Sequence, residues 1–219
     1  MRAAARGANT MMCELAARSV DQQFGWGGSP ENWGGLFFPG DVALRGRDPL
    51  VYHNVRGVLG VLRDPKVIDP LRAAIADADP CVRRLAAPLL GRVRNPRAVE
   101  VLRAALRDAN PGTRAMAALG LGFAGNTQTG GSLVPVLSDP ATEVRVMAAW
   151  ALGEIGSQEA ARPLIAILTD PDPRVRATVA WALGELEDRT ALAPLTALLH
   201  GDRDAEVRKS AAWALGNLK

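Results

Sequence analysis

Internal repetition with a period of 31 residues is the feature that most constrains what this chain can fold into. Three residue types recur in one register, and each column is stretched by one residue at its last interval. The columns are Gly60, Gly91, Gly122, Gly153, Gly184 and Gly216; Arg83, Arg114, Arg145, Arg176 and Arg208; and Asp77, Asp108, Asp139, Asp170 and Asp202. Self-similarity at such a period is typical of solenoids, in which each unit packs against its neighbours.

Each period predicts two amphipathic helices. Apolar residues from Val144 to Ile155 fall on one helical face, and a second apolar face follows the break at Gly156. Residues with short polar side chains precede both helices and are expected to cap them. They are Asp79, Asn110, Asp172 and Asp204 for first helices, and Asp64, Asn95, Asn126, Ser157 and Asp188 for second helices. The predicted fold is an all-α solenoid of stacked antiparallel helical hairpins.

Two regions follow from the period. The repeats occupy 46–219, with units one to five at 46–76, 77–107, 108–138, 139–169 and 170–201, and half a unit after them. Residues 1–45 do not share the period and hold Phe24, Trp26, Trp33, Phe37 and Phe38. Because disordered linkers are poor in aromatic residues, we expect this segment to cap unit one, with a docking loop as the alternative.

Two segments carry a resemblance to a known family. DPDPRVRATVAWALGEL and DPATEVRVMAAWALGEIGSQEAARPLIAIL resemble the HEAT-like repeats named after phycobilisome lyases. The resemblance covers roughly 46–219 and implies first helices on the convex face and second helices on the concave face. Such repeats occur in scaffolds, adaptors and lyase subunits, so the resemblance does not imply one activity.

The candidate site is the polar side of the second helices, because solenoids commonly bind partners along one extended surface. The helical projection places these residues there: Lys66, Asp69, Arg97, Glu100, Arg107, Gln128, Glu159, Arg162 and Thr190. They predict a module that binds or scaffolds a protein partner through a concave surface. An ordinary solvated face would carry the same residue types.

The charge distribution leaves two further functions open. Lys and Arg outnumber Asp and Glu by 13 to 7 in residues 46–114, whereas the counts are 9 and 12 in residues 115–219. Unit two carries the basic stretch Arg83, Arg84, Arg92, Arg94, Arg97, Arg103 and Arg107. It suits phosphate or an acidic protein, so nucleic-acid binding is one alternative, although no aromatic residues for base stacking interleave with it. A subunit of a phycobilin-lyase-like complex, implied by the resemblance, is the other.

Three further features have a structural and a functional interpretation. The Asp and Arg columns predict a ladder between units rather than a catalytic pair, because the pair recurs along the array. Trp150, Trp181 and Trp213 lie off the core stripe of their helices, so they either pack against a neighbouring unit or form a partner surface. Gly130 and Gly131 predict a weak hinge in unit three or a close approach to its backbone.

Catalytic and metal-binding motifs are not found. The two histidines, His53 and His200, lie far apart in the array, and HExxH and GxSxG are absent. We therefore expect no cofactor and no metal site, and we favour a binding role over an enzymatic one. With no apolar run of ~18 residues, no membrane span is predicted, and a cytoplasmic location is expected. Self-association through the C-terminal end is left open.

Overall fold

The computed structural model describes residues 65–218, and residues 1–64 and 219 lie outside the described part. The cap or docking loop expected in residues 1–45 therefore lies outside it. Every regular element between 65 and 218 is helical. In chain order they are η3 (Pro65–Val67), α5 (Ile68–Ile75), α6 (Pro80–Gly91), α7 (Pro96–Ala105), α8 (Pro111–Ala124), η4 (Thr127–Thr129), α9 (Gly130–Leu133), η5 (Val134–Ser138), α10 (Thr142–Glu154), η6 (Gln158–Ala160), α11 (Ala161–Ala166), α12 (Pro173–Leu186), η7 (Arg189–Ala191), α13 (Leu192–Gly201) and α14 (Ala205–Asn217).

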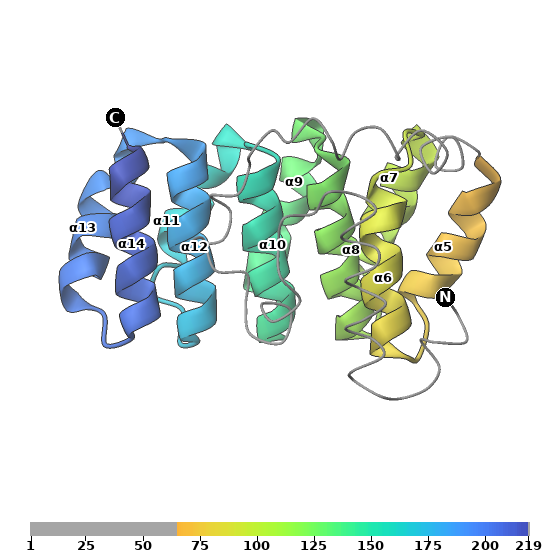
Figure 1. The fold of residues 1–219 in the computed structure, drawn as a ribbon, viewed down its shortest axis with the longest axis horizontal. Helices are drawn as coiled ribbons and strands as arrows, with labels where there is room; N and C mark the ends of the chain where they lie inside the picture. The colour runs from red at the N-terminus through yellow and green to blue at the C-terminus, as the bar shows by residue number, and fades with distance from the viewer. Residues whose placement is uncertain (1–64, 219) are drawn as a thin grey trace, which may run out of the picture.

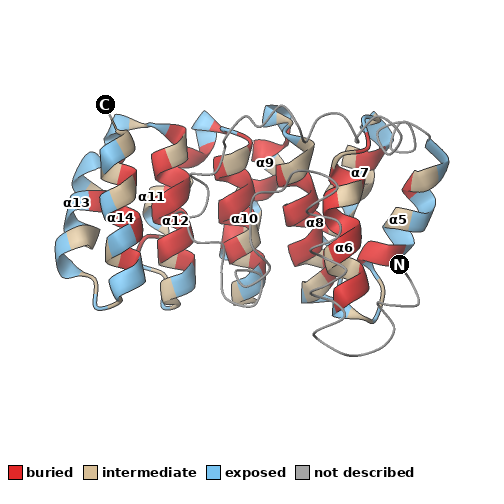
Figure 2. Ribbon diagram, viewed as in Figure 1, coloured by how far each residue is buried: buried red, intermediate tan, exposed pale blue. Residues whose placement is uncertain are grey.

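The helices form two layers, as the repeat predicts. α6, α8, α10, α12 and α14 stand side by side in the first-helix row, and α5, α7, α9, α11 and α13 form the second-helix row behind it (Figure 1). Buried residues concentrate along the first-helix row (Figure 2). Val144 and Leu152 of α10 and Leu164 of α11 are among the fully buried residues between the layers. The all-α solenoid is thus confirmed.

Seven of the capping residues expected from the sequence bind the first turn of their helices. The oxygens of Asp79, Asn110, Asp172 and Asp204 accept the first-turn N–H two residues later at 2.8–2.9 Å, and those of Asn95, Asn126 and Asp188 do so at 2.8–3.0 Å. Such bonds satisfy amides that have no partner inside the helix. Ser157 is the exception, because its side chain makes no capping bond. Asp64 lies outside the described residues.

The glycine column lets neighbouring first helices approach closely. A Cβ atom at Gly153 would lie 2.9 Å from Cα of Ala182 and 2.9 Å from the ring of Trp181, both in the next unit. At Gly184 it would lie 2.7 Å from Cα of Ala214. Contacts this short exclude any side chain larger than hydrogen, so glycine sets the spacing of the first-helix row.

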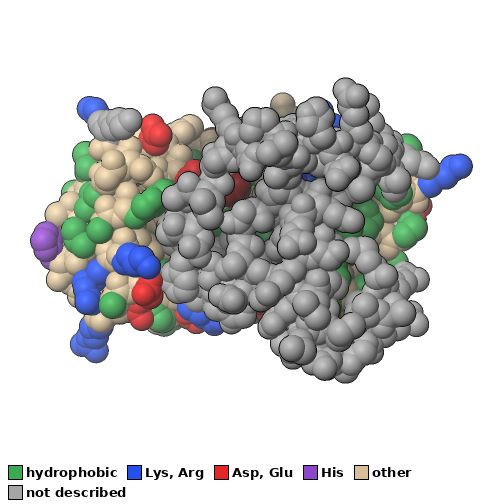
Figure 3. Space-filling view, in the orientation of Figure 1, with side chains coloured by type: hydrophobic (Ala, Val, Ile, Leu, Met, Phe, Trp, Pro, Cys, Tyr) green, Lys and Arg blue, Asp and Glu red, His purple; other side chains and the backbone are tan. Residues whose placement is uncertain are grey.

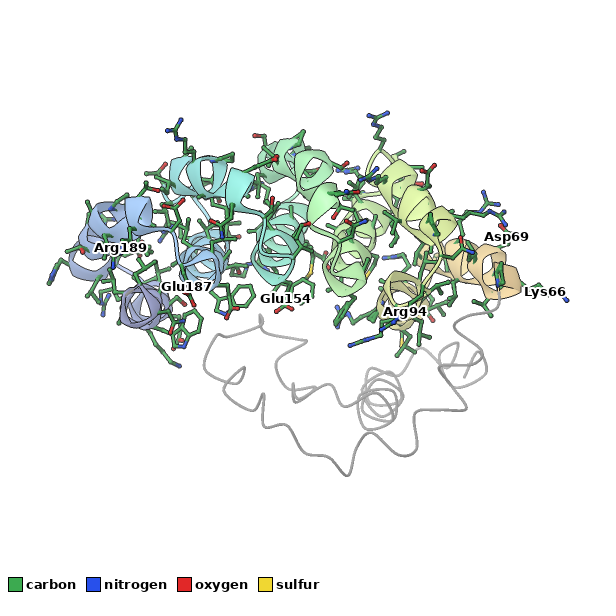
Figure 4. All side chains as sticks on the ribbon, turned by 90° about the horizontal axis from the view of Figure 1, so that it is seen from above. Lys66, Asp69, Arg94, Glu154, Glu187 and Arg189 are labelled. Carbon is green, nitrogen blue, oxygen red and sulfur yellow. The ribbon has the colours of Figure 1, made fainter. Side chains whose placement is uncertain are left out.

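This spacing also sets the direction of curvature, and here the expectation was wrong. First helices contact one another extensively along their row, whereas second helices contact one another little. The closely spaced row must lie on the inside of the curve. Figure 4 shows α6 to α14 on the concave side and α5 to α13 on the convex side, the reverse of the arrangement implied by the resemblance.

Unit three departs from the other units in its second helix. This helix is divided into η4, the four-residue α9 and η5. Gly130 is buried, and a Cβ atom there would collide with the Ser157 side chain of the next unit, whereas Gly131 faces open space. A close approach to the backbone, the alternative to the hinge, is thus found at Gly130, and the hinge stays a prediction.

An arginine–aspartate ladder joins successive units, as predicted. Arg114 donates from Nε and Nη2 to Asp139 at 2.7 and 2.8 Å, and its Nη1 donates to the carbonyl oxygen of Asp108 at 2.9 Å. Arg145 with Asp170 and Arg176 with Asp202 repeat this geometry. The aspartate also accepts a turn amide, as Asp139 does from Ala141 at 2.9 Å. One residue pair therefore fixes both the turn and the next unit.

The first ladder position differs from the others. Arg83 donates to the carbonyl oxygens of Asp77 and Ala78 at 2.6 and 2.9 Å, and within residues 65–218 it forms no ion pair with Asp108. Its guanidinium lies beside Gly112 instead. The three intact pairs thus join units three to six.

The tryptophan column packs between units. Trp150 is 4% exposed and Trp181 is 3% exposed, and their rings lie against Gly122 and Gly153 of the preceding units. Trp213 lies against Gly184 and is half-buried. The packing interpretation is confirmed for this column, and these rings help to fix the stacking distance.

Candidate protein-binding surface

All nine predicted site residues are exposed and belong to the second-helix row or its turns. We call them the outer surface: Lys66, Asp69, Arg97, Glu100, Arg107, Gln128, Glu159, Arg162 and Thr190. In Figure 4, the labelled Lys66 and Asp69 project from α5 and its preceding turn, away from the first-helix row. Amphipathic spacing correctly predicts which side of each second helix faces solvent. Because that row is convex, the expected concave placement is wrong.

Few contacts join the members of this surface. Arg97 donates to Asp69 at 2.8 Å across units one and two, but the side chains are 58% and 52% exposed, so solvent screens the pair. Thr190 donates to Asp188 through its backbone N–H and its hydroxyl, and these bonds lower the pKa of the Asp188 carboxyl. Arg162 adds a weaker electrostatic effect in the same direction. Glu100, Arg107 and Glu159 of the surface are also exposed.

A basic pocket opens at one edge of this surface. It has a volume of about 700 Å³ and lies where α6 and α8 end and α7 begins. Three arginines contribute to its wall, Arg92, Arg94 and Arg103, and one carboxylate, Glu100, stands among them. Gln128 of the outer surface also lines it. Figure 4 looks down on this edge of the molecule, with Arg94 labelled near α6.

Two contacts shape the pocket wall. The Arg92 guanidinium lies 4.6 Å from the centroid of the Phe123 ring, a cation–π distance. Arg103 donates from Nη2 to the carbonyl oxygen of Gln128 at 3.0 Å. The pocket therefore spans units two and three. The basic stretch of unit two is visible in the sequence, but its convergence with the unit-three turn depends on stacking.

Comparison of the sequence with models of protein families identifies the family of this chain. A model described as HEAT repeats matches residues 41–122 and 131–216, which is most of the chain. This chain belongs to the HEAT repeat family. The predicted resemblance to HEAT-like repeats is thus confirmed. A search of curated proteins finds no match.

Solved structures similar to this HEAT repeat protein are repeat solenoids. The complex of CpcE and CpcF of phycocyanin lyase from Nostoc is 22% identical with a TM-score of 0.63, covering 69% of this chain and 99% of that chain. A designed armadillo repeat protein in complex with the peptide (KR)4 is 21% identical with a TM-score of 0.52, covering 80% and 96%. The Escherichia coli protein YibA is 24% identical with a TM-score of 0.51, covering 80% and 66%. At these identities the likeness shows the fold.

Other parts of the described HEAT array show less concentrated chemistry than the basic pocket. At the end formed by α13 and α14, hydrophobic, basic and acidic side chains are interspersed (Figure 3). Within residues 65–218 no group of three or more His, Cys, Asp or Glu side chains is placed to hold a metal ion. No described helix is long and apolar enough to cross a membrane. The outer surface and its pocket are therefore the best candidates.

Proposed function

We propose that this HEAT repeat protein is a scaffold that binds a protein partner along its outer surface. The observation that carries the proposal is the exposure of all nine predicted residues on consecutive units. The Arg–Asp ladder joins units three to six in a fixed register, so the part of the surface carried by Gln128, Glu159, Arg162 and Thr190 is preorganised and little ordering accompanies binding there. The designed armadillo protein similar to this chain carries a peptide, which supports binding by such a solenoid.

Charge reversal on this surface tests the proposal. Arg97→Glu/Arg162→Glu changes two exposed arginines in units two and four, and Arg203→Glu/Lys209→Glu is the matched control on exposed residues near α14. Proteins captured from nuclease-treated lysate are identified, and their binding is remeasured with purified components. We expect a partner that the wild type and the control retain and the first variant loses. Equal retention by both variants would place binding elsewhere.

A second function rests on the likeness to the CpcE and CpcF complex. The chain would then be a subunit of a lyase-type complex and would bind a tetrapyrrole. Titration with a bilin should shift its visible absorbance if this alternative holds. An unchanged spectrum together with capture of a protein through Arg97 and Arg162 would rule out this alternative and support the scaffold function.

A further inference from the structure

The basic pocket has the chemistry of an anion site within the array. Its wall brings together Arg92, Arg94 and Arg103 against the single carboxylate of Glu100. Arg94 is exposed, and no carboxylate among the described residues pairs with Arg94 or Arg103. Other arginines of this array are already occupied, since Arg114, Arg145 and Arg176 each bind an aspartate. The pocket thus holds two guanidinium groups, those of Arg94 and Arg103, that no carboxylate of the described residues neutralises.

The guanidinium group of Arg103 is only partly hydrogen-bonded. Its Nη2 is used by the Gln128 carbonyl oxygen, while its Nε is buried and has no hydrogen-bond partner. A buried donor without an acceptor destabilises the folded state. Because Nε is closed to solvent, the Arg103 side chain must turn before a carboxylate can reach it; a carboxylate that did so would supply the missing acceptor through a charge-assisted bond.

The form of the pocket distinguishes among anionic partners. Nucleic-acid binding needs many phosphate contacts along an extended track, and single strands need exposed aromatic rings for stacking. Here the arginines converge on one pocket, and the Phe123 ring is covered by Arg92 at 4.6 Å and lies 5.1 Å from the Trp150 ring. The geometry therefore favours a short acidic segment over a nucleic-acid strand.

We propose that this pocket is the anchor point for an acidic segment of the partner protein, with carboxylates bound by Arg94 and Arg103. The inference rests on the proposed scaffold function and adds the chemistry of the partner. Because Glu100 and Gln128 belong to both the pocket and the outer surface, a segment anchored here continues along the second-helix row.

Direct titration of the full chain with a labelled hexaglutamate peptide tests the proposal. Fluorescence anisotropy should report binding that weakens as salt rises, with no binding of hexaglutamine or of a Lys-Arg peptide. Arg94→Glu and Arg103→Gln should each weaken binding at least about tenfold, because each removes a charge-assisted hydrogen bond. Arg72→Glu, on an exposed arginine of α5 that belongs neither to the pocket nor to the outer surface, should leave it within about twofold.

The alternatives predict different results. Equal weakening by Arg72→Glu would show general attraction to the basic first units and overturn the proposal. A single-stranded oligonucleotide that binds through Arg94 while hexaglutamate does not would also overturn it. Arg94 is exposed, so its variant keeps the test valid even if Arg103→Gln unfolds. Loss of capture by Arg97→Glu/Arg162→Glu without hexaglutamate binding would overturn this inference and leave the scaffold function standing.

Discussion

The guanidinium group of each ladder arginine makes two different kinds of contact. One side binds the aspartate of the next unit and the other binds carbonyl oxygens of its own turn. The sequence predicts the pairing because both columns share the period. It does not predict the carbonyl bonds or the turn amide bound by the aspartate, because these depend on the backbone path between Asp139 and Arg145. The spacing therefore predicts the ion pair, whereas the hydrogen bonds to the turn become visible only in the structure.

Removing one ladder arginine should destabilise the array. In Arg145→Ala, Asp170, whose side chain is 7% exposed, loses its bidentate partner, and the carbonyl oxygen of Asp139 loses a donor. We expect the free energy of unfolding in urea to fall by about 2–3 kcal/mol, since a largely buried charge is left unpaired. Arg174→Ala breaks a pair whose arginine is 51% exposed and should cost less than about 1 kcal/mol. Equal losses would contradict the structural role of the ladder.

The same pairs predict how stability depends on pH. Hydrogen bonds from Arg114 and Arg176 lower the pKa values of Asp139 and Asp202 in the folded state. Their stabilisation is complete above the unfolded-state pKa of about 4 and is lost as the pH falls through the lower folded-state values. The urea midpoint should therefore decline below about pH 4. Asp139→Asn/Asp202→Asn should be less stable at pH 7 and show a shallower acid decline; an unchanged slope would contradict this cause.

Helix packing explains both what the sequence predicts and where it fails. Amphipathic spacing assigns the core face of α10 and the exposed face of α7, and both assignments hold. It cannot tell which row lies inside the curve, because curvature depends on the distance between units. The small residues Gly153 and Ala182 at the first-helix contact contain that information. Side-chain size along each row, rather than hydropathy alone, would have predicted the convex placement of the outer surface.

Alanine substitution in the glycine column tests this explanation. Gly153→Ala places a methyl group 2.9 Å from Cα of Ala182 and should destabilise the array by about 1–3 kcal/mol, despite the better helix propensity of alanine. Gly216, in the same column, has no heavy atom within 4 Å of a built Cβ, so Gly216→Ala should stabilise it by about 0.5 kcal/mol. Urea unfolding monitored by circular dichroism measures both. Stabilisation by both substitutions would rule out close packing at Gly153.

The candidate site could be predicted only in part because it combines residues from different units. Exposure of each outer-surface residue follows from local helical spacing. The basic pocket does not, since it needs Arg103 of α7 to reach Gln128 in the turn after α8. The nearest sequence indication is the basic stretch of unit two, which does not identify the unit-three residues that complete the wall.

Self-association through α14 stays a prediction at the level of the whole array. Ala149 and Gly153 are buried toward the next unit, whereas Ala212 and Gly216 at the same repeat positions are exposed. A second copy stacked on α14 would cover them as interior units do. Light scattering should then give a mass that rises with protein concentration, and Ala212→Glu should abolish the rise. A constant monomer mass would contradict the prediction.

The ladder has a consequence for how such a chain can evolve. Arg114 and Arg145 each bind an aspartate 25 residues further along the chain, and Arg176 binds one 26 residues further, so the same bond tolerates one extra residue between the partners. A duplicated segment of one period would bring its own arginine, aspartate and glycine in the correct order. The junctions on both sides would then form bonds already present in the parent. Gene duplication or deletion of a unit could thus change the length of the array without requiring new compensating mutations at the junctions.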